Sequence, residues 1–309
     1  MFTRRKKALI LLNTSSGTGR AASLTMEIIK RLAQRGYEPI LYPIIPKTDL
    51  VSEMILPEYE DQLDMVVCSG GDGTLNHVVQ SIMQMKNRPL LSYIPTGSTN
   101  DFAKGLSIPV DFDKALDMIF NGNRFQYDIG KFNGSYFNYV AAFGAFSAVS
   151  YATDQQLKNL LGHAAYILSA IGDFPEHLSY TCHMRIETDN EVTEGDYIFG
   201  AICSAVSVGG FPIFKDANVK LNDGKMELLL IRAPKTPVDL QETLNAILKG
   251  TMDHPSITFR QISKVSLHAE NSVAWSLDGE YGGSYKDVTV EVQQQAVTIM
   301  SGIKGQGGN

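Results

Sequence analysis

The stretch of the sequence with the most chemical content is Gly70-Gly-Asp-Gly-Thr74, which places three glycines within four positions. Successive backbone N–H groups in such a turn can form an anion-binding nest at the start of a helix. Asp72 is unexpected beside a phosphate, because a bare carboxylate repels it. A Mg²⁺ ion held between the two groups resolves the conflict. The alternative is an ordinary turn in which Asp72 or Thr74 caps the following helix.

Two other polar loops follow short apolar runs. Asn13-Thr-Ser-Ser-Gly-Thr-Gly19 comes after residues 8–12, and Pro95-Thr-Gly-Ser-Thr-Asn-Asp101 comes after residues 90–94. The glycine loop at 70–74 likewise follows the apolar run 65–68. If these runs are parallel strands, the three loops lie at the carboxyl edge of one sheet, where ligands bind in such folds.

Strands and helices are expected to alternate over the first part of the chain. The expected strands are 8–12, 39–45, 65–68 and 90–94, and helical spacing of apolar residues predicts helices near 21–35, 75–83 and 113–120. This alternation predicts an α/β domain over residues 1–127 with a parallel sheet covered by helices on both faces. The C-terminal segment of the chain is a candidate to complete this domain.

The rhythm changes after residue 128. Asn133-Gly134 and Asp189-Asn190 are predicted turns between strands. We expect helices near 155–172 and 237–249, and strands at 180–188, 196–206, 226–232, 262–269, 272–278, 287–293 and 296–300. Residues 128–300 are therefore predicted to form an antiparallel β domain, with Trp275 in its core.

Composition excludes several classes of protein. The 309 residues contain 27 Lys and Arg against 33 Asp and Glu, and this net charge of −6 argues against a general nucleic-acid binder. Cys68, Cys182 and Cys203 are too few and too scattered for a disulfide framework. No apolar segment approaches the ~18 residues of a membrane span, and the run 8–12 behind the basic N-terminus is too short for a signal peptide. We expect a soluble, cytoplasmic protein.

Several motifs together resemble one family. Gly70–Thr74 resembles a signature shared by diacylglycerol and sphingosine kinases, NAD kinases and phosphofructokinases. Asn13–Gly17 resembles the Asn-Pro-x-Ser-Gly loop of the lipid kinases, and Pro95–Asp101 their Pro-x-Gly-Thr/Ser-x-Asn-Asp loop. Asp128-Ile-Gly130 and Leu277-Asp-Gly-Glu-Tyr-Gly-Gly283 resemble two later motifs of the soluble bacterial diacylglycerol kinases. The order holds along nearly the whole chain, although Thr14 replaces the family Pro and Ile44 stands about where a nucleotide-contacting Thr often lies.

The resemblance implies a role for individual residues. The implied ATP-binding residues are Asn13, Ser16, Gly17, Gly70, Gly71, Asp72, Gly73, Thr74 and Ser98. Asp72, Asp101 and Asp128 match a network of aspartates that acts through waters on Mg²⁺. Without the family, an N-cap would be favoured for Asp101 and a strand-end turn for Asp128.

Two further assignments also rest on the resemblance. Glu280 matches the general base, whereas Asp278-Gly-Glu280 taken alone is a common turn, with Asp278 an orienting neighbour. Asp223, with the backbone carbonyls of Lys220 and Lys225, matches a structural cation site, and the alternative there is an Asp-Gly turn between strands.

The implied protein is an ATP- and Mg²⁺-dependent kinase that converts diacylglycerol to phosphatidic acid. The family fold adds a β-sandwich as the second, lipid-binding domain, with the active site in the cleft between the domains. Its lipid substrate would be met at a membrane surface through basic residues, for which Arg4, Arg5, Lys6, Lys7 and Lys104 are candidates. A homodimer is compatible with the sequence, and no nucleic-acid partner is expected. The alternatives are a kinase of another lipid alcohol (a sphingoid base, phosphatidylglycerol or a prenol), NAD kinase, and a non-catalytic nucleotide or lipid sensor.

Overall fold

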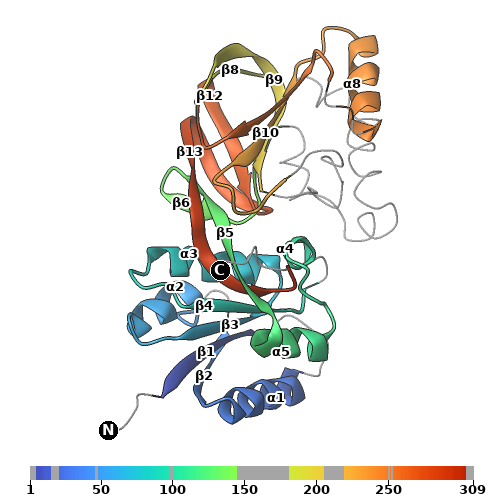
Figure 1. The fold of residues 1–309 in the computed structure, drawn as a ribbon. Helices are drawn as coiled ribbons and strands as arrows, with labels where there is room; N and C mark the ends of the chain where they lie inside the picture. The colour runs from blue at the N-terminus through green and yellow to red at the C-terminus, as the bar shows by residue number, and fades with distance from the viewer. Residues whose placement is uncertain are drawn as a thin grey trace. The chain divides into compact units, whose positions relative to one another are not determined.

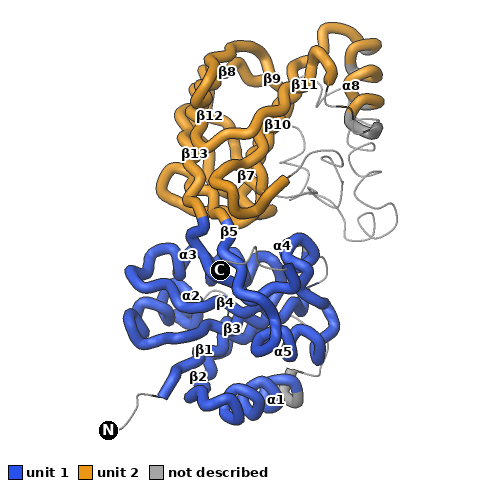
Figure 2. Tube along the Cα trace, in the orientation of Figure 1, with its two compact units in different colours: residues 1–127, 295–309 blue, residues 128–294 orange. Residues whose placement is uncertain are grey.

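The computed structural model describes residues 5–14, 21–45, 48–97, 100–144, 181–204, 219–249, 251 and 253–303 (Figure 1). The helix expected near 155–172 lies outside these residues. The chain forms two compact units, one of residues 1–127 with 295–309 and one of residues 128–294 (Figure 2). In the parts of the chain that are described, no helix is long and apolar enough to cross a membrane.

The first unit is built on a sheet whose order is β2-β1-β3-β4. Its strands are β1 (Lys6–Asn13), β2 (Tyr37–Ile44), β3 (Met65–Gly70) and β4 (Leu90–Pro95), and each neighbouring pair runs parallel. Strand β4 also pairs in parallel with the end of β13 (Glu280–Ser301), at Leu91 and Ile299. The loops after β1, β3 and β4 therefore start from the same edge of the sheet.

Helices cover this sheet with apolar faces. They are α1 (Ala21–Gln34), α2 (Ser52–Ile55), the 3₁₀ helix η1 (Leu56–Tyr59), α3 (Asp72–Gln84), α4 (Asp101–Gly105) and α5 (Phe112–Asn121). One core cluster joins Ile28 and Leu32 of α1 and Leu116 of α5 to Ile10 and Val67 of the sheet. Helix α5 starts where the side chain of Asp111 accepts a hydrogen bond of 3.1 Å from the Lys114 N–H, an ordinary N-cap.

The second unit is β-rich and antiparallel. Its elements are β5 (Asn123–Phe132), which starts in the first unit, β6 (Ser135–Phe137), β7 (Val140–Gly144), β8 (Cys182–Thr188), β9 (Val192–Cys203), β10 (Met226–Arg232), α8 (Pro237–Lys249), β11 (Ile257–Ile262), β12 (Lys264–Leu277) and most of β13. The strand order is β11-β10-β9-β7-β12-β13, and β8 pairs with β9 and β12. The expected mixed α/β architecture with a β-rich second half is confirmed.

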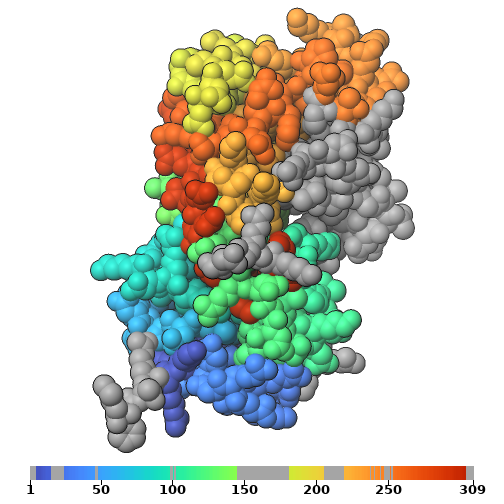
Figure 3. All heavy atoms as spheres, viewed as in Figure 1, coloured from blue at the N-terminus to red at the C-terminus, as the bar shows by residue number. Residues whose placement is uncertain are grey.

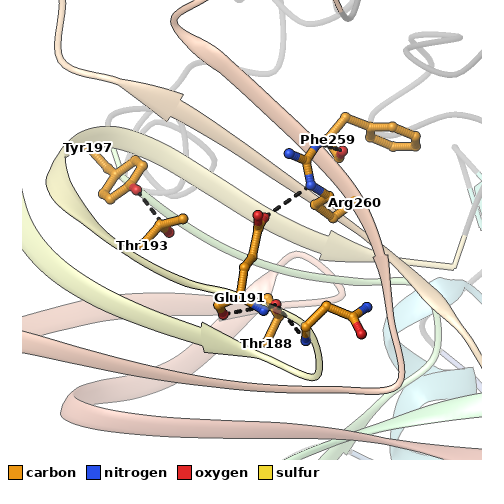
Figure 4. Close-up of polar contacts among 7 residues, drawn as sticks. Thr188, Glu191, Thr193, Tyr197, Phe259 and Arg260 are labelled. Carbon is orange, nitrogen blue, oxygen red and sulfur yellow. Dashed lines mark hydrogen bonds and ion pairs between the residues drawn. The ribbon is translucent and has the colours of Figure 1, made fainter.

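Both predicted hairpin turns are present. Asn133-Gly134 joins β5 to β6 through the Phe132–Ser135 pair, and Asn133 takes the left-handed φ of 49° that such a turn requires. At the β8–β9 turn the Thr188 N–H donates to the Glu191 carbonyl over 2.9 Å. The Glu191 carboxylate in turn accepts a 3.0 Å hydrogen bond from Arg260 Nε, which ties this turn to β11 (Figure 4).

Three strand predictions need correction. Residues 262–269 and 272–278 belong to one strand, β12, because the ladder with β13 continues past a register shift between His268 and Val273. The runs 287–293 and 296–300 are likewise one strand, β13, whose last residues join the first unit. The structure also contains strand β11 at 257–262, whereas the sequence predicted that a strand would begin only at residue 262. In each case pairing with neighbouring strands carries the extended backbone through polar residues that lack an apolar alternation.

The core of the second unit centres on Trp275. Its side chain is 1% exposed, and its ring lies 5.0 Å from Phe132 and 4.8 Å from Phe143, measured between centroids. The predicted core position of Trp275 is confirmed.

Candidate functional site

The glycine loop joins β3 directly to α3. Strand β3 ends at Gly70, Gly71 is the N-cap, and Asp72 is the first residue of the helix. The suggestion that Asp72 or Thr74 is the N-cap is therefore wrong. Gly71 has no side chain and therefore cannot cap the N–H groups in the first turn of α3. Backbone N–H groups at the start of a helix can bind an anion.

The glycine loop packs against the loop after β4 through backbone alone. A Cβ atom added to Gly97 would lie 2.7 Å from the Cα atom of Gly71, closer than real contacts allow. The Thr96 N–H donates a 2.8 Å hydrogen bond to the Gly70 carbonyl across the same contact. Gly97 must therefore be glycine for the two loops to meet, whereas a Cβ on Gly71 would lie 3.3 Å from the Gly97 Cα, a tight contact.

The carboxyl end of β1 joins the same cluster. Asn13, the last residue of β1, donates from Nδ2 to the Thr74 Oγ1 atom over 2.7 Å. Thr74 also packs closely over Gly70, where an added Cβ would lie 2.6 Å from the Thr74 Cβ. Of the predicted nucleotide-binding residues, the structure thus brings Asn13 together with Gly70–Thr74. Ser16, Gly17 and Ser98 lie outside the described residues.

Asn100 organises the loop after β4 and has no role in the sequence-based site. Its Oδ1 atom accepts from the Gly97 N–H at 3.0 Å, and its Nδ2 atom donates to the Gly97 carbonyl at 2.7 Å. It is the N-cap residue of α4, with a left-handed φ of 49°. Tyr93 supports both loops, since its hydroxyl donates to the Gly70 carbonyl at 3.1 Å.

Asp101 follows Asn100 as the first residue of α4, so its suggested role as N-cap is wrong. Asparagine is enriched at positive φ and at helix N-caps, but neither preference distinguishes Asn100 from other polar loop residues in the sequence.

The second unit holds the predicted cation loop. Asp128 is completely buried within β5, so the reading of it as a strand-end turn is wrong. Its N–H donates to the Leu221 carbonyl at 2.8 Å, and its Oδ2 atom accepts from the Gly224 N–H at 2.7 Å. The structure therefore joins Asp128 to the segment that lies between Lys220 and Lys225.

Asp223 takes part in a turn and lies beside a second carboxylate. Its Oδ1 atom accepts from the Lys225 N–H at 3.1 Å, and the following Gly224 has a φ of 78°. Glu227, on β10, is 1% exposed, and burial together with the charge of Asp223 raises the pKa of Glu227 to about 7. A carboxylate, with a second one nearby and backbone carbonyls in the loop, is a donor set that suits a hard cation. Glu227 was missed, although a glutamate inside the apolar run 226–231 is a recognisable signal.

The β12–β13 hairpin carries the predicted base. Leu277 pairs with Glu280, so Asp278 and Gly279 form a two-residue turn, with φ values of 50° and 88°. A Cβ atom built on Gly279 would meet no described atom within 4 Å apart from its chain neighbours. Glu280 is exposed at the start of β13, next to Tyr281 with 62% exposure.

The Asp278 carboxylate holds this turn against the backbone of residues 138–140. Its Oδ2 atom accepts from the Asn138 N–H at 2.6 Å, and its Oδ1 atom accepts from the Tyr139 and Val140 N–H groups at 3.0 Å each. The Asp278 N–H donates back to the Val140 carbonyl at 2.8 Å. The carboxylate is 4% exposed, and this burial outweighs the hydrogen bonds and raises its pKa to about 6. These contacts fix the turn that precedes Glu280, and the orienting role of Asp278 stays a prediction.

Comparison with known proteins identifies the family. The family described as diacylglycerol kinase catalytic domain matches residues 7–132, and the YegS C-terminal NAD kinase β-sandwich-like domain matches residues 140–301. A diacylglycerol kinase of Staphylococcus saprophyticus is 32% identical over 281 residues, which cover 90% of each chain. The chain belongs to the diacylglycerol kinase family. The family resemblance inferred from the motifs is therefore confirmed, and the chain is a kinase.

Other relatives extend the comparison. A diacylglycerol kinase of Staphylococcus carnosus is 31% identical over 281 residues, again 90% of both chains. The fold is shared with a crystal structure of a candidate diacylglycerol kinase from Bacillus anthracis strain Sterne, with a TM-score of 0.80, 23% identity and coverage of 97% and 98% of the two chains. An NAD kinase from Archaeoglobus fulgidus, solved in complex with ATP, has a TM-score of 0.54 at 14% identity and coverage of 96% and 94%.

Proposed function

We propose that this lipid kinase transfers the γ-phosphoryl group of ATP to the hydroxyl of diacylglycerol, giving phosphatidic acid, in a Mg²⁺-dependent reaction. The observation that carries the proposal is that the end of β1 meets the loops after β3 and β4 at one edge of the parallel strands. Asn13 donates a 2.7 Å hydrogen bond to Thr74, and the backbones of Gly71 and Gly97 pack so closely that Gly97 has no room for a side chain. Such a cradle at the start of a helix suits a triphosphate.

The residues of the first unit hold the nucleotide in this proposal. The N–H groups of the first turn of α3 bind phosphate oxygens, and Asn13 and Thr74 keep the two loops in register. Mg²⁺, when bound, neutralises charge that develops on the transferred phosphoryl group. Asp72 lies at the helix start where that ion would be held, and Asp101 remains a proposed member of the same network. Asp128, which belongs to the second unit, is the third proposed member. Ser16, Gly17 and Ser98 remain proposed nucleotide contacts.

The second unit supplies the proton acceptor. Glu280 takes the proton of the lipid hydroxyl while the hydroxyl oxygen forms a bond to the γ-phosphorus of ATP. The bond between the γ-phosphorus and the oxygen that bridges it to the β-phosphate breaks, and ADP leaves. The hairpin turn held by Asp278 keeps Glu280 in a defined place, with space beside Gly279 for substrate. In the same unit, Asp223 and the carbonyls of Lys220 and Lys225 hold a structural cation in this proposal.

Diacylglycerol is favoured over other acceptors because both staphylococcal relatives are named diacylglycerol kinase. The NAD kinase of Archaeoglobus fulgidus shares the fold at 14% identity, which favours ATP as the donor but does not favour NAD as the acceptor. The proposal includes a cytoplasmic protein that meets its lipid by peripheral electrostatic contact through exposed basic residues such as Lys104. In this proposal a homodimer is allowed and no nucleic-acid partner is expected.

Phosphate transfer from labelled ATP tests this function. The full chain is incubated with Mg²⁺ and with mixed micelles containing diacylglycerol, a sphingoid base, phosphatidylglycerol or a prenol, and NAD is offered in a parallel reaction. We expect phosphatidic acid as the main product and no labelled product without Mg²⁺. Preferential labelling of another lipid would replace the acceptor, and labelled NADP without labelled lipid would contradict a lipid kinase.

A further inference from the structure

Asn76 lies one helical turn beyond Asp72 on α3. Residues four apart are neighbours on one face of a helix, so the Asn76 amide and the Asp72 carboxylate are adjacent side chains at the phosphate-binding end of α3. Neither the motifs nor the loop contacts described above give Asn76 a role.

The Asn76 side chain is buried, and its amide oxygen lacks a hydrogen-bond partner among the described residues. The residue is 5% exposed, and the amide oxygen is its Oδ1 atom. The other buried polar residue of this helix, Ser81, is satisfied, because its hydroxyl donates to the His77 carbonyl at 2.9 Å. The remaining buried positions of α3 are apolar: Leu75, Val78, Val79, Ile82 and Met83.

A buried oxygen that accepts no hydrogen bond destabilises the folded protein, because it has lost water and gained nothing. Leucine has a similarly branched side chain and would avoid this penalty in a helix that is otherwise apolar on its buried side. Such groups are found where a bound molecule completes the hydrogen bond, at some expense of stability.

The missing partner is a hydrogen-bond donor or a cation, because an amide oxygen accepts hydrogen bonds and can ligate a metal but cannot donate. Phosphate oxygens also only accept, so the nucleotide's phosphates cannot satisfy Oδ1. Mg²⁺ keeps several of its waters when it binds to a protein together with phosphates, and those waters are strong donors. Asp72, one turn away, is a second acceptor for the same water shell.

We propose that Asn76 is a positioning residue for the metal of the nucleotide complex, whose Oδ1 atom accepts a hydrogen bond from a water on Mg²⁺. The inference rests on the proposed use of ATP and Mg²⁺. It adds a contact between the Asn76 amide and the hydrated ion, while the backbone N–H groups bind the phosphates.

The test compares nucleotide binding with and without the metal. Calorimetry measures the affinity of the full chain and of its Asn76→Leu variant for ATP, once with Mg²⁺ and once with EDTA. We expect the variant to lose about tenfold in affinity for the Mg²⁺ complex, the size of one hydrogen bond to a charged group, and to change less than about twofold for metal-free ATP. Its melting temperature without ligand should equal or exceed that of the wild type.

Two further variants serve as controls. Asn76→Asp keeps an acceptor at the same place and should retain the Mg²⁺-dependent part of the affinity. Ser92→Ala removes another buried polar atom, on β4, whose hydroxyl is 0% exposed and bonds to no described group. It should leave nucleotide binding unchanged with and without the metal.

Three outcomes would overturn the inference. Equal losses of affinity with Mg²⁺ and with EDTA would place the amide on the nucleotide itself. Unchanged binding with a lowered melting temperature would make Asn76 a structural residue. If the wild-type protein binds ATP no better with Mg²⁺ than without it, the proposed function fails, and this inference fails with it.

Discussion

The Nδ2 atom of Asn13 donates a hydrogen bond of 2.7 Å to the Oγ1 atom of Thr74, 61 residues further along the chain. The bond joins the end of β1 to the first turn of α3, and both groups are partly buried. It fixes the end of β1 against the first turn of α3, two segments that are separate in sequence and that hold one triphosphate in the proposed function.

A double-mutant cycle tests this link. Asn13→Ala and Thr74→Val should each weaken ATP binding by roughly five- to tenfold, the value of about one hydrogen bond. The double variant should be little worse than either single one, because each change already removes the shared contact. Calorimetric titration with MgATP measures all four proteins. Fully additive losses would show that the two side chains contribute independently.

Asp72→Ala should leave a folded protein whose kinase activity is lower by orders of magnitude. Its carboxylate stands at the start of α3, beside a backbone arrangement suited to phosphates, where a metal bridge makes a negative charge favourable. Lipid phosphorylation at saturating Mg²⁺ is the measurement, with the melting temperature as the check on folding. Turnover close to that of the wild type would remove Asp72 from the catalytic centre.

Glu280→Gln keeps the shape of the side chain and removes the base, so kcat for lipid phosphorylation should fall by ~10²–10⁴. Nucleotide affinity should change little, because the phosphate-binding loops belong to the other unit. Calorimetry and phosphate transfer are measured on the same preparation. If the variant phosphorylates lipid normally, the base is elsewhere. If ATP affinity falls together with turnover, Glu280 serves the nucleotide.

Asp223→Ala should act on stability before activity. If a cation is bound beside Asp223, Mg²⁺ stabilises the folded protein by mass action, and the variant loses that gain. Melting curves with Mg²⁺ and with EDTA measure it, and the EDTA curves of wild type and variant provide the baseline. A wild-type melting temperature that does not respond to Mg²⁺ would argue against a cation in this loop.

Glu227→Gln should change how stability depends on pH. Burial raises the pKa of Glu227 from 4.5 to about 7, so between these values the folded chain binds more protons than the unfolded chain. The contribution of this group to stability is present below pH 4.5 and is lost as the pH rises through 7. Glutamine does not titrate. The free energy of unfolding of the variant, relative to that of the wild type, should therefore rise by about 3 kcal/mol between pH 4.5 and pH 7.

Urea unfolding in EDTA at several pH values between 5 and 8 measures this difference. The matched control is Glu242→Gln, an exposed glutamate of α8 in the same unit, which should follow the wild type. Parallel pH profiles for Glu227→Gln and wild type would show that Glu227 titrates normally.

Local structure was largely predictable from the sequence, because it depends on residues close together in the chain. The glycines of 70–74 predict the turn into a helix, and α3 does begin at Asp72. Asn133-Gly134 predicts a tight hairpin, since these residues accept positive φ, and Asn133 adopts it. Apolar spacing predicts α8 at 237–249, where the structure has it. The motifs were also sufficient to indicate the family.

Tertiary structure decided which of these pieces meet. Nothing in the neighbourhood of Asp128 indicates that its carboxylate accepts from Gly224, 96 residues away. Asn100 looks like an ordinary loop residue until its side chain is seen to bracket Gly97. The raised pKa values of Glu227 and Asp278 come from burial, which depends on strands from distant parts of the chain. Pairing and desolvation are long-range properties of the packed chain, whereas turns and helix starts follow from the backbone preferences of a few adjacent residues.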